Sequence, residues 1–78
     1  MNMATLTELG RSYLDELKKN PSDLNIFNIA TRINGLVWKG TAQKLEPKDK
    51  RVIVDAIFDG ADEDLKSKKR KLEESVGI

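Results

Sequence analysis

The chain contains no cysteine, so no disulfide can hold its 78 residues together and folding must rest on apolar packing. Apolar residues are scarce, because hydrophobic residues make up 38% of the chain and charged residues 35%. A chain of this length forms one small domain with a small core. We therefore expect residues 1–78 to form a single domain, stabilised by tight helix packing or by self-association, most simply as a homodimer.

Histidine is also absent, which restricts the chemistry open to the chain. Histidine and cysteine supply most of the acid–base, nucleophilic and transition-metal chemistry of proteins near neutral pH. The sequence has no phosphate-binding glycine loop and no zinc-ligand spacing, and the acidic cluster within residues 59–64 lacks the spacing of a calcium-binding loop. We expect no catalytic residues, no metal site and no cofactor, and we interpret the chain as something other than an enzyme.

The first expected helix covers residues 5–19. Thr5 and Glu8 have the spacing of a capping box at its start. Gly10 lies beside the apolar stripe of this helix, where the absence of a side chain allows a neighbouring helix to come close. Asn20 and Pro21 end the helix. The apolar stripe itself recurs with helical periodicity and consists of Leu6, Leu9, Tyr13, Leu14 and Leu17.

A second helix is expected over residues 25–38, with Asn20 or Ser22 as its cap and Pro21 at a tolerated first position. The pattern is clearly amphipathic. The apolar side consists of Ile26, Ile29, Ala30, Ile33, Leu36 and Val37. The opposite side is a stripe without apolar residues, formed by Asn25, Asn28, Arg32, Gly35 and Lys39.

Residues 33–38 also fit a different structure. Asn34-Gly35 between apolar residues is the strongest short hairpin signal, because the turn needs two residues that tolerate positive φ. We favour the helix, since its period extends over a longer stretch than the strand alternation does. The predicted fold class is all-α, a small bundle of three core helices plus a charged C-terminal fourth helix. The alternative is an α+β fold with a hairpin around Asn34-Gly35.

A loop is expected over residues 40–45, and a third helix follows it. Glu46 can cap this helix, Pro47 suits its first position and Asp49 places an acid in its first turn. Gly60 is a plausible stop. The buried face of the helix is expected to consist of Val52, Ile53, Ala56, Ile57 and Phe58.

The C-terminal segment, residues 62–78, is expected to form a charged helix that begins near Asp62. Its apolar positions are only Leu65, Leu72 and Val76, so such a helix can protrude from the bundle or fray. Residues of opposite charge four apart would pair along it, at about 0.2–0.5 kcal/mol for each pair. These expected pairs are Asp62 with Lys66, Asp64 with Lys68, Lys69 with Glu73, and Arg70 with Glu74.

The same segment carries a basic block, which we define as Lys66, Lys68, Lys69, Arg70 and Lys71. Two interpretations are open: a solvated helix face with local ion pairs, or a surface that binds the phosphates of nucleic acid. The net charge of the chain is only +1, so no long-range attraction toward nucleic acid is expected. We favour the solvated face and keep a small nucleic-acid-binding protein as the alternative function.

Arg32, Trp38 and Lys39 are the candidate partner-binding residues. Tryptophan and arginine most often dominate the binding energy of protein interfaces, and Trp38 is the only tryptophan in the chain. On the expected second helix, Trp38 lies at the end, and Arg32 and Lys39 share the polar stripe. The other interpretation is that Trp38 packs into the core while Arg32 and Lys39 are solvated.

The sequence as a whole predicts a non-catalytic binding or regulatory module that acts by contact with another protein. No apolar run approaches the about 20 residues that a membrane helix needs. Residues 1–9 lack both the basic start and the apolar stretch of a secretory signal. We therefore expect a cytoplasmic protein that has no membrane partner.

Overall fold

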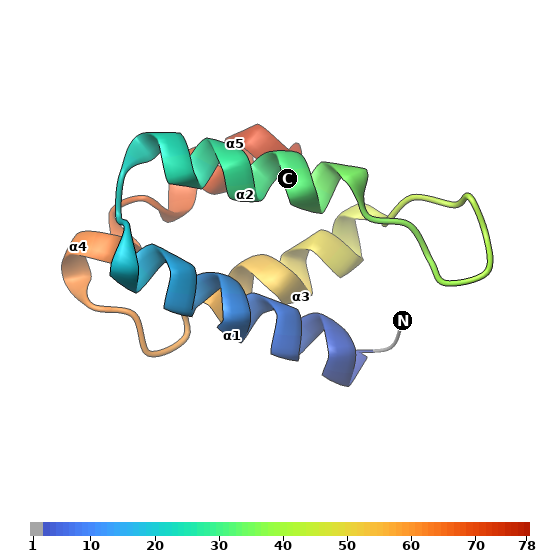
Figure 1. The fold of residues 1–78 in the computed structure, drawn as a ribbon, viewed down its shortest axis with the longest axis horizontal. Helices are drawn as coiled ribbons and strands as arrows, with labels where there is room; N and C mark the ends of the chain where they lie inside the picture. The colour runs from blue at the N-terminus through green and yellow to red at the C-terminus, as the bar shows by residue number, and fades with distance from the viewer. Residues whose placement is uncertain (1–2) are drawn as a thin grey trace.

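The structure is a computed structural model that describes residues 3–78, and it confirms the all-α fold class (Figure 1). Two pairs of helices pack together, α1 along α3 and α2 along α5. Within residues 3–78 the only β-type contact is an isolated antiparallel bridge between Val37 and Lys44. The helices are α1 (Met3–Lys19), α2 (Asp23–Gly35), α3 (Pro47–Phe58), α4 (Glu63–Lys66) and α5 (Lys69–Val76).

The core is made of the apolar faces that helical periodicity predicts. All the long helices contribute to one cluster of side chains, and the short α4 adds Leu65 to it. The fully buried members with the largest volume are Leu17, Ile26, Ile29, Ile33, Ile53, Ile57, Leu72, Val54 and Val76.

Helix α1 packs closely against α3 at Gly10. A Cβ atom at this position would lie 2.6 Å from the Cβ of Ala56, which confirms that the glycine permits a close approach. The expected capping box is wrong, because α1 begins at Met3 and Thr5 therefore lies inside the helix. All the residues of the predicted apolar stripe are buried or partly buried. The apolar periodicity therefore predicted the buried face of this helix correctly, whereas the capping pattern did not predict its start.

Helix α2 is shorter than predicted. Ser22 caps it, and its hydroxyl accepts the backbone N–H of Asn25 at 3.1 Å. The helix ends at Gly35, and Leu36 has an extended backbone with ψ 143°. The prediction of a helix through Trp38 is therefore wrong. Trp38 and Lys39 lie in the loop between α2 and α3, which forms the projecting end of the molecule in Figure 1.

The hairpin alternative around Asn34-Gly35 is also wrong. A type I′ turn needs positive φ at both central residues, and neither Asn34 nor Gly35 has it. The Asn34 side chain instead donates to the carbonyl of Ser75 at 3.0 Å. The small β-type contact lies further along, where Trp38 N–H donates to the carbonyl of Gln43 at 2.9 Å.

Helix α3 begins as the sequence predicts. Pro47 occupies the first turn, and the backbone N–H of Glu46 donates to the Asp49 carboxylate at 3.0 Å. Ile53, Ile57 and Phe58 are buried as expected. Gly60, with φ of +80°, takes the left-handed conformation just after the helix ends, which is the role predicted for it.

The C-terminal segment forms two helices where one was predicted. Asp62 caps α4 as expected, its carboxylate accepting the N–H of Leu65 at 2.9 Å. The helix is interrupted at Ser67 and Lys68, where the N–H of Lys68 bonds to the carbonyl of Leu65, three residues back. This tighter turn separates α4 from α5 and allows each to bury its own apolar residues.

Helix α5 packs into the fold and does not protrude from it. Leu72 and Val76 are buried against α2 and α3, although the segment has few other apolar residues. Polar contacts complete its C-terminal end, because Lys50 Nζ donates to the carbonyl of Val76 at 3.0 Å and Asn34 donates to that of Ser75. The carbonyls that any helix leaves unpaired at its C-terminus are thus satisfied from α2 and α3.

Candidate functional site

The basic block is drawn into ion pairs that connect different helices. Lys68 and Lys71 both donate to the Asp23 carboxylate, at 3.0 and 2.9 Å. Asp23 is the first residue of α2, so these contacts tie the start of α5 to the start of α2. The two hydrogen bonds from lysine lower the pKa of Asp23 below its usual value. The positive charge of both lysines thus favours the ionised form of this carboxylate.

The remaining cations of the block follow the predicted pairing only in part. Arg70 pairs with Glu74 at 3.2 Å, as expected for residues four apart. Lys69 reaches Asp55 of α3 at 3.3 Å, and Glu73, its predicted partner, binds Arg51. The other two expected pairs within the segment do not form, since Lys68 turns toward Asp23 and Lys66 has no ion pair within residues 3–78. Tertiary packing brings carboxylates of α2 and α3 within reach of this helix.

These ion pairs reduce the attraction that the basic block offers to phosphate. Four of its five cations already contact a carboxylate: Lys68, Lys69, Arg70 and Lys71. A nucleic-acid backbone would have to displace or share those carboxylates before it gained from counterion release. No observation in the structure thus favours the nucleic-acid alternative.

Arg32, a candidate partner-binding residue, connects α2 to α1. Its guanidinium donates two hydrogen bonds to the Glu16 carboxylate, at 2.8 and 3.2 Å. The guanidinium carbon also lies 5.0 Å from the centre of the Tyr13 ring, within the range of a cation–π contact. The hydrogen bonds that Arg32 donates to Glu16 raise the pKa of Arg32 above its usual value. The planar fork of arginine suits this double contact, so Arg32 has a structural role whether or not it binds a partner.

Trp38 lies at a different place from Arg32. It packs partly buried against the core and lines a groove of about 370 Å³ with Leu6, Val52 and two polar residues of α3. Arg32 stacks on Tyr13, which is seven residues or about 10 Å further along α1 than Leu6. Lys39 is exposed in the loop. The structure thus does not bring the three candidates together on one helix face.

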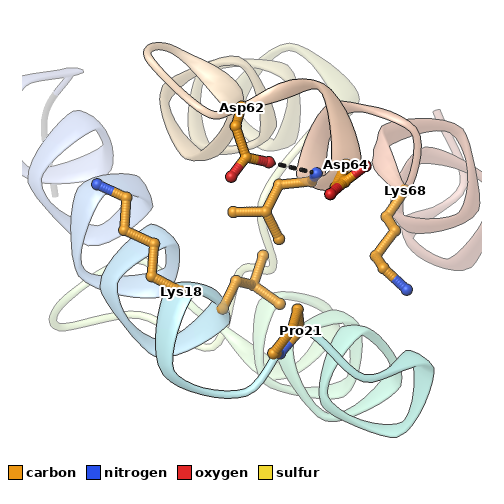
Figure 2. A pocket seen from close by; sticks show the side chains of 7 residues that line it. Lys18, Pro21, Asp62, Asp64 and Lys68 are labelled. Atoms are coloured by element: carbon orange, nitrogen blue, oxygen red, sulfur yellow. Dashed lines mark hydrogen bonds between the residues drawn. The ribbon is translucent and has the colours of Figure 1, made fainter.

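A small pocket of about 200 Å³ lies between the end of α1 and α4 (Figure 2). Leu17 and Leu65 form its apolar part, and Lys18 and Lys68 extend away from it on opposite sides. Two of its polar side chains already have structural partners, since Asp62 caps α4 and Lys68 binds Asp23. The pocket is completed by Pro21 and Asp64, and it offers no convergent set of free polar groups to a ligand.

Neither a metal cluster nor a membrane span is found in the described part of the chain. Residues 3–78 contain no group of three or more acidic side chains placed to hold a metal ion. Over the same range, no helix combines the length and the apolar character needed to cross a membrane. Within the predicted acidic cluster, Asp62 caps α4.

The most unusual surface is on α2. Leu24 is 73% exposed and Phe27 is 63% exposed, and they lie three residues apart on one side of the helix. We call this surface the α2 outer face. It consists of Leu24, Phe27, Asn28, Thr31 and Gly35, all exposed and all uncharged.

The charged residues Asp23 and Arg32, which border the α2 outer face, are held in ion pairs. Asp23 on one border is held by Lys68 and Lys71, and Arg32 on the other is held by Glu16. A shallow groove of about 500 Å³ runs beside Asn28 and Thr31 toward α1. In a chain that is 35% charged, this produces a continuous uncharged strip along one helix.

Sequence reasoning predicted part of the exposed side correctly, since Asn28, Arg32 and Gly35 are exposed, but it assigned Leu24 and Phe27 to no face and so missed the α2 outer face. Asn25, expected on the exposed side, is 9% exposed, and its amide donates to the carbonyl of Asn20 at 2.8 Å. This hydrogen bond pairs a backbone carbonyl at the end of α1, and it holds the Asn25 side chain against α1 and away from solvent. The exposed side is therefore centred on Leu24 and Thr31. The sequence did contain a signal for this face, because helical periodicity places Leu24 and Phe27 on a different side of the helix from the isoleucine stripe.

We compared the chain with protein-family models, with curated proteins and with solved structures, and nothing in any of the three matches it.

Proposed function

We propose that this chain is a non-catalytic module that acts by protein–protein contact through the α2 outer face. The observation that carries the proposal is the exposure of Leu24 and Phe27, 73% and 63%, side by side within an uncharged strip. Single exposed apolar residues are common on soluble proteins. An adjacent leucine and phenylalanine on a regular helix present a larger patch, and burying such a patch is favourable by about 25 cal/mol per Å².

The chemistry of the strip indicates the kind of partner. Interface centres are depleted of charge and enriched in aromatic residues, whereas their rims are polar. Phe27 supplies the aromatic residue, and the ion-paired Asp23 and Arg32 supply the rim. A helix packs best on another helix, with side chains of one between side chains of the other. The partner we propose therefore presents an amphipathic helix whose contact face is uncharged. This chain would act as a regulator by covering that helix of the partner.

Site-specific photo-crosslinking tests this proposal in cells that naturally contain the chain. A photoreactive phenylalanine analogue replaces Asn28 on the α2 outer face, and the matched control carries it at Asp15, an exposed residue of α1. We expect covalent protein adducts from position 28 and none from position 15. Replacing Phe27 with glutamate in the position-28 chain should remove the adducts. The absence of any protein adduct at position 28 would contradict the proposed function.

A further inference from the structure

We propose that the partner of the α2 outer face is the same face of a second copy of this chain, with the two α2 helices antiparallel. This inference rests on the proposed function, because it names the occupant of the contact surface described above. The arrangement of residues along α2 and the charges around the face point to this occupant, and the area of the face indicates how strongly the two copies bind.

The α2 outer face has an approximately symmetric arrangement. Leu24 and Thr31 lie equally far from the midpoint between Phe27 and Asn28, about 5 Å toward either end of the helix. A two-fold axis at that midpoint therefore places Leu24 opposite Thr31 of the partner subunit, a large side chain against a small one. The same axis brings Phe27 beside Phe27 of the partner subunit. A two-fold interface requires this kind of self-complementarity.

The charges of the chain permit two copies to approach through this face. No residue of the α2 outer face is charged, and the net charge of the whole chain is only +1. Asp23 and Arg32 on its borders are ion-paired within each copy, so neither is exposed to the other copy as an unpaired charge. An antiparallel pair also sets the positive end of one helix dipole beside the negative end of the other.

The size of the face predicts a weak, reversible dimer. Helix α2 has 13 residues, which corresponds to a length of about 20 Å. Two packed helices lie 8–10 Å apart, so a single helix pair covers much less than the about 800 Å² per partner of a standard interface. The groove beside Asn28 and Thr31 adds some contact. We expect a dissociation constant in the range of about 10 μM to about 1 mM.

Sedimentation equilibrium of the full chain across that concentration range is the first test. We expect a mass that rises from monomer toward dimer. Phe27→Glu should weaken association at least about thirtyfold, as for a residue at the centre of an interface, without lowering the melting temperature. Gln43→Glu makes the same change of charge in the exposed loop after α2 and should leave association unchanged. A monomer at every concentration would overturn the inference.

Cysteine cross-linking tests the antiparallel geometry, and the natural absence of cysteine makes each single variant unambiguous. Asn28→Cys lies beside the two-fold axis and should form a disulfide-linked dimer under mild oxidation. Thr31→Cys lies about 10 Å along the helix from its counterpart, beyond the reach of a disulfide, and should remain monomeric. Gln43→Cys controls for random collision. Rapid cross-linking of Thr31→Cys would indicate parallel helices and would overturn the proposed arrangement.

The two proposals fail in different ways. Photo-adducts at position 28 that contain only other proteins, together with a monomeric purified chain, would overturn the homodimer and leave the contact function standing. A complete lack of adducts, together with a monomeric chain, would overturn both. Adducts with twice the mass of the chain, lost on Phe27→Glu, support both.

Discussion

Gly10 and Ala56 lie so close that a Cβ atom at position 10 would be 2.6 Å from the Cβ of Ala56 and 2.7 Å from the carbonyl oxygen of Ile53. Neither neighbour is the flexible end of a long side chain, so any added atom must push α1 away from α3. This contact joins the two helices that pack most extensively in the molecule. The absence of a side chain at Gly10 therefore determines the spacing of half of the bundle.

Gly10→Ala should lower the free energy of unfolding by about 1–3 kcal/mol, the range for overpacking a core. Helix propensity alone predicts the opposite sign, because alanine is favoured over glycine inside a helix by about 1 kcal/mol. Gly35→Ala is the matched control, since nothing lies within 4 Å of an added Cβ there and φ is not positive. It should be neutral or slightly stabilising in a urea titration. Equal stabilisation by both substitutions would show that α1 and α3 do not pack this closely.

Asp23→Asn should destabilise the chain through loss of the charged contacts with Lys68 and Lys71. The folded-state pKa of Asp23 is lowered, so its stabilisation is fully present above the unfolded value of about 3.9 and is lost as the pH falls through the folded value. We expect a constant difference in melting temperature from wild type between about pH 5 and pH 7, which shrinks below about pH 4.

The control for this pH dependence is Asp15→Asn, an exposed carboxylate on α1 with no ion pair within residues 3–78. Its melting temperature should follow that of the wild type over the whole range. A difference between wild type and Asp23→Asn that persists unchanged into acid would mean that the charge of Asp23 is not what stabilises α5 on α2.

The chain should not bind nucleic acid at physiological salt, because Lys68, Lys69, Arg70 and Lys71 are paired with carboxylates. Fluorescence anisotropy with labelled duplex and single-stranded probes, at low and at physiological salt, measures this directly. Micromolar binding that falls by about 0.9 log unit per log unit of salt for each phosphate contacted would contradict the prediction. Neutral substitutions of these four residues would then have to abolish that binding.

Trp38→Ala should destabilise the chain by about 2 kcal/mol or more, approaching the about 3–5 kcal/mol typical of a buried tryptophan. The indole packs partly buried against the core beside Leu6 and Val52, so the substitution leaves a gap there. Chemical denaturation measures this loss, and the cross-linking assay above measures binding. Lys39→Ala serves as the comparison from the same loop and should change neither. A stable Trp38→Ala that loses its partner would place Trp38 on the interface after all.

Local patterns were enough to locate most of the helices. Ser22, Pro47 and Asp62 mark helix starts through hydrogen bonds or φ constraints that involve only the next few residues, so their effect does not depend on the rest of the fold. The apolar periodicity of α1 and α3 likewise reports which side of each helix faces a core. Gly10 could be recognised because its position beside that stripe already implied a close neighbour.

The C-terminal end of α2 and the roles of its polar residues depended on other helices. Asn34 has the composition of a hairpin turn, yet its amide binds the carbonyl of Ser75, which lies 41 positions away in sequence. Asn25 turns inward because the end of α1 offers it two carbonyls. The partner of Asn34 lies outside any short-range pattern, and the carbonyls that bind Asn25 lie five and nine residues before it, in the preceding helix and its end.

The sequence by itself determined the fold class, the starts of α2, α3 and α4 and the small size of the core, because these follow from short-range hydrogen bonding, periodicity and composition. Only the tertiary structure decided that α5 packs on α2 and that four cations of the basic block contact the carboxylates of Asp23, Asp55 and Glu74. The physical reason is the separation in sequence of the residues that interact. A backbone cap involves residues a few positions apart, whereas an ion pair between helices depends on how the whole chain has folded back on itself.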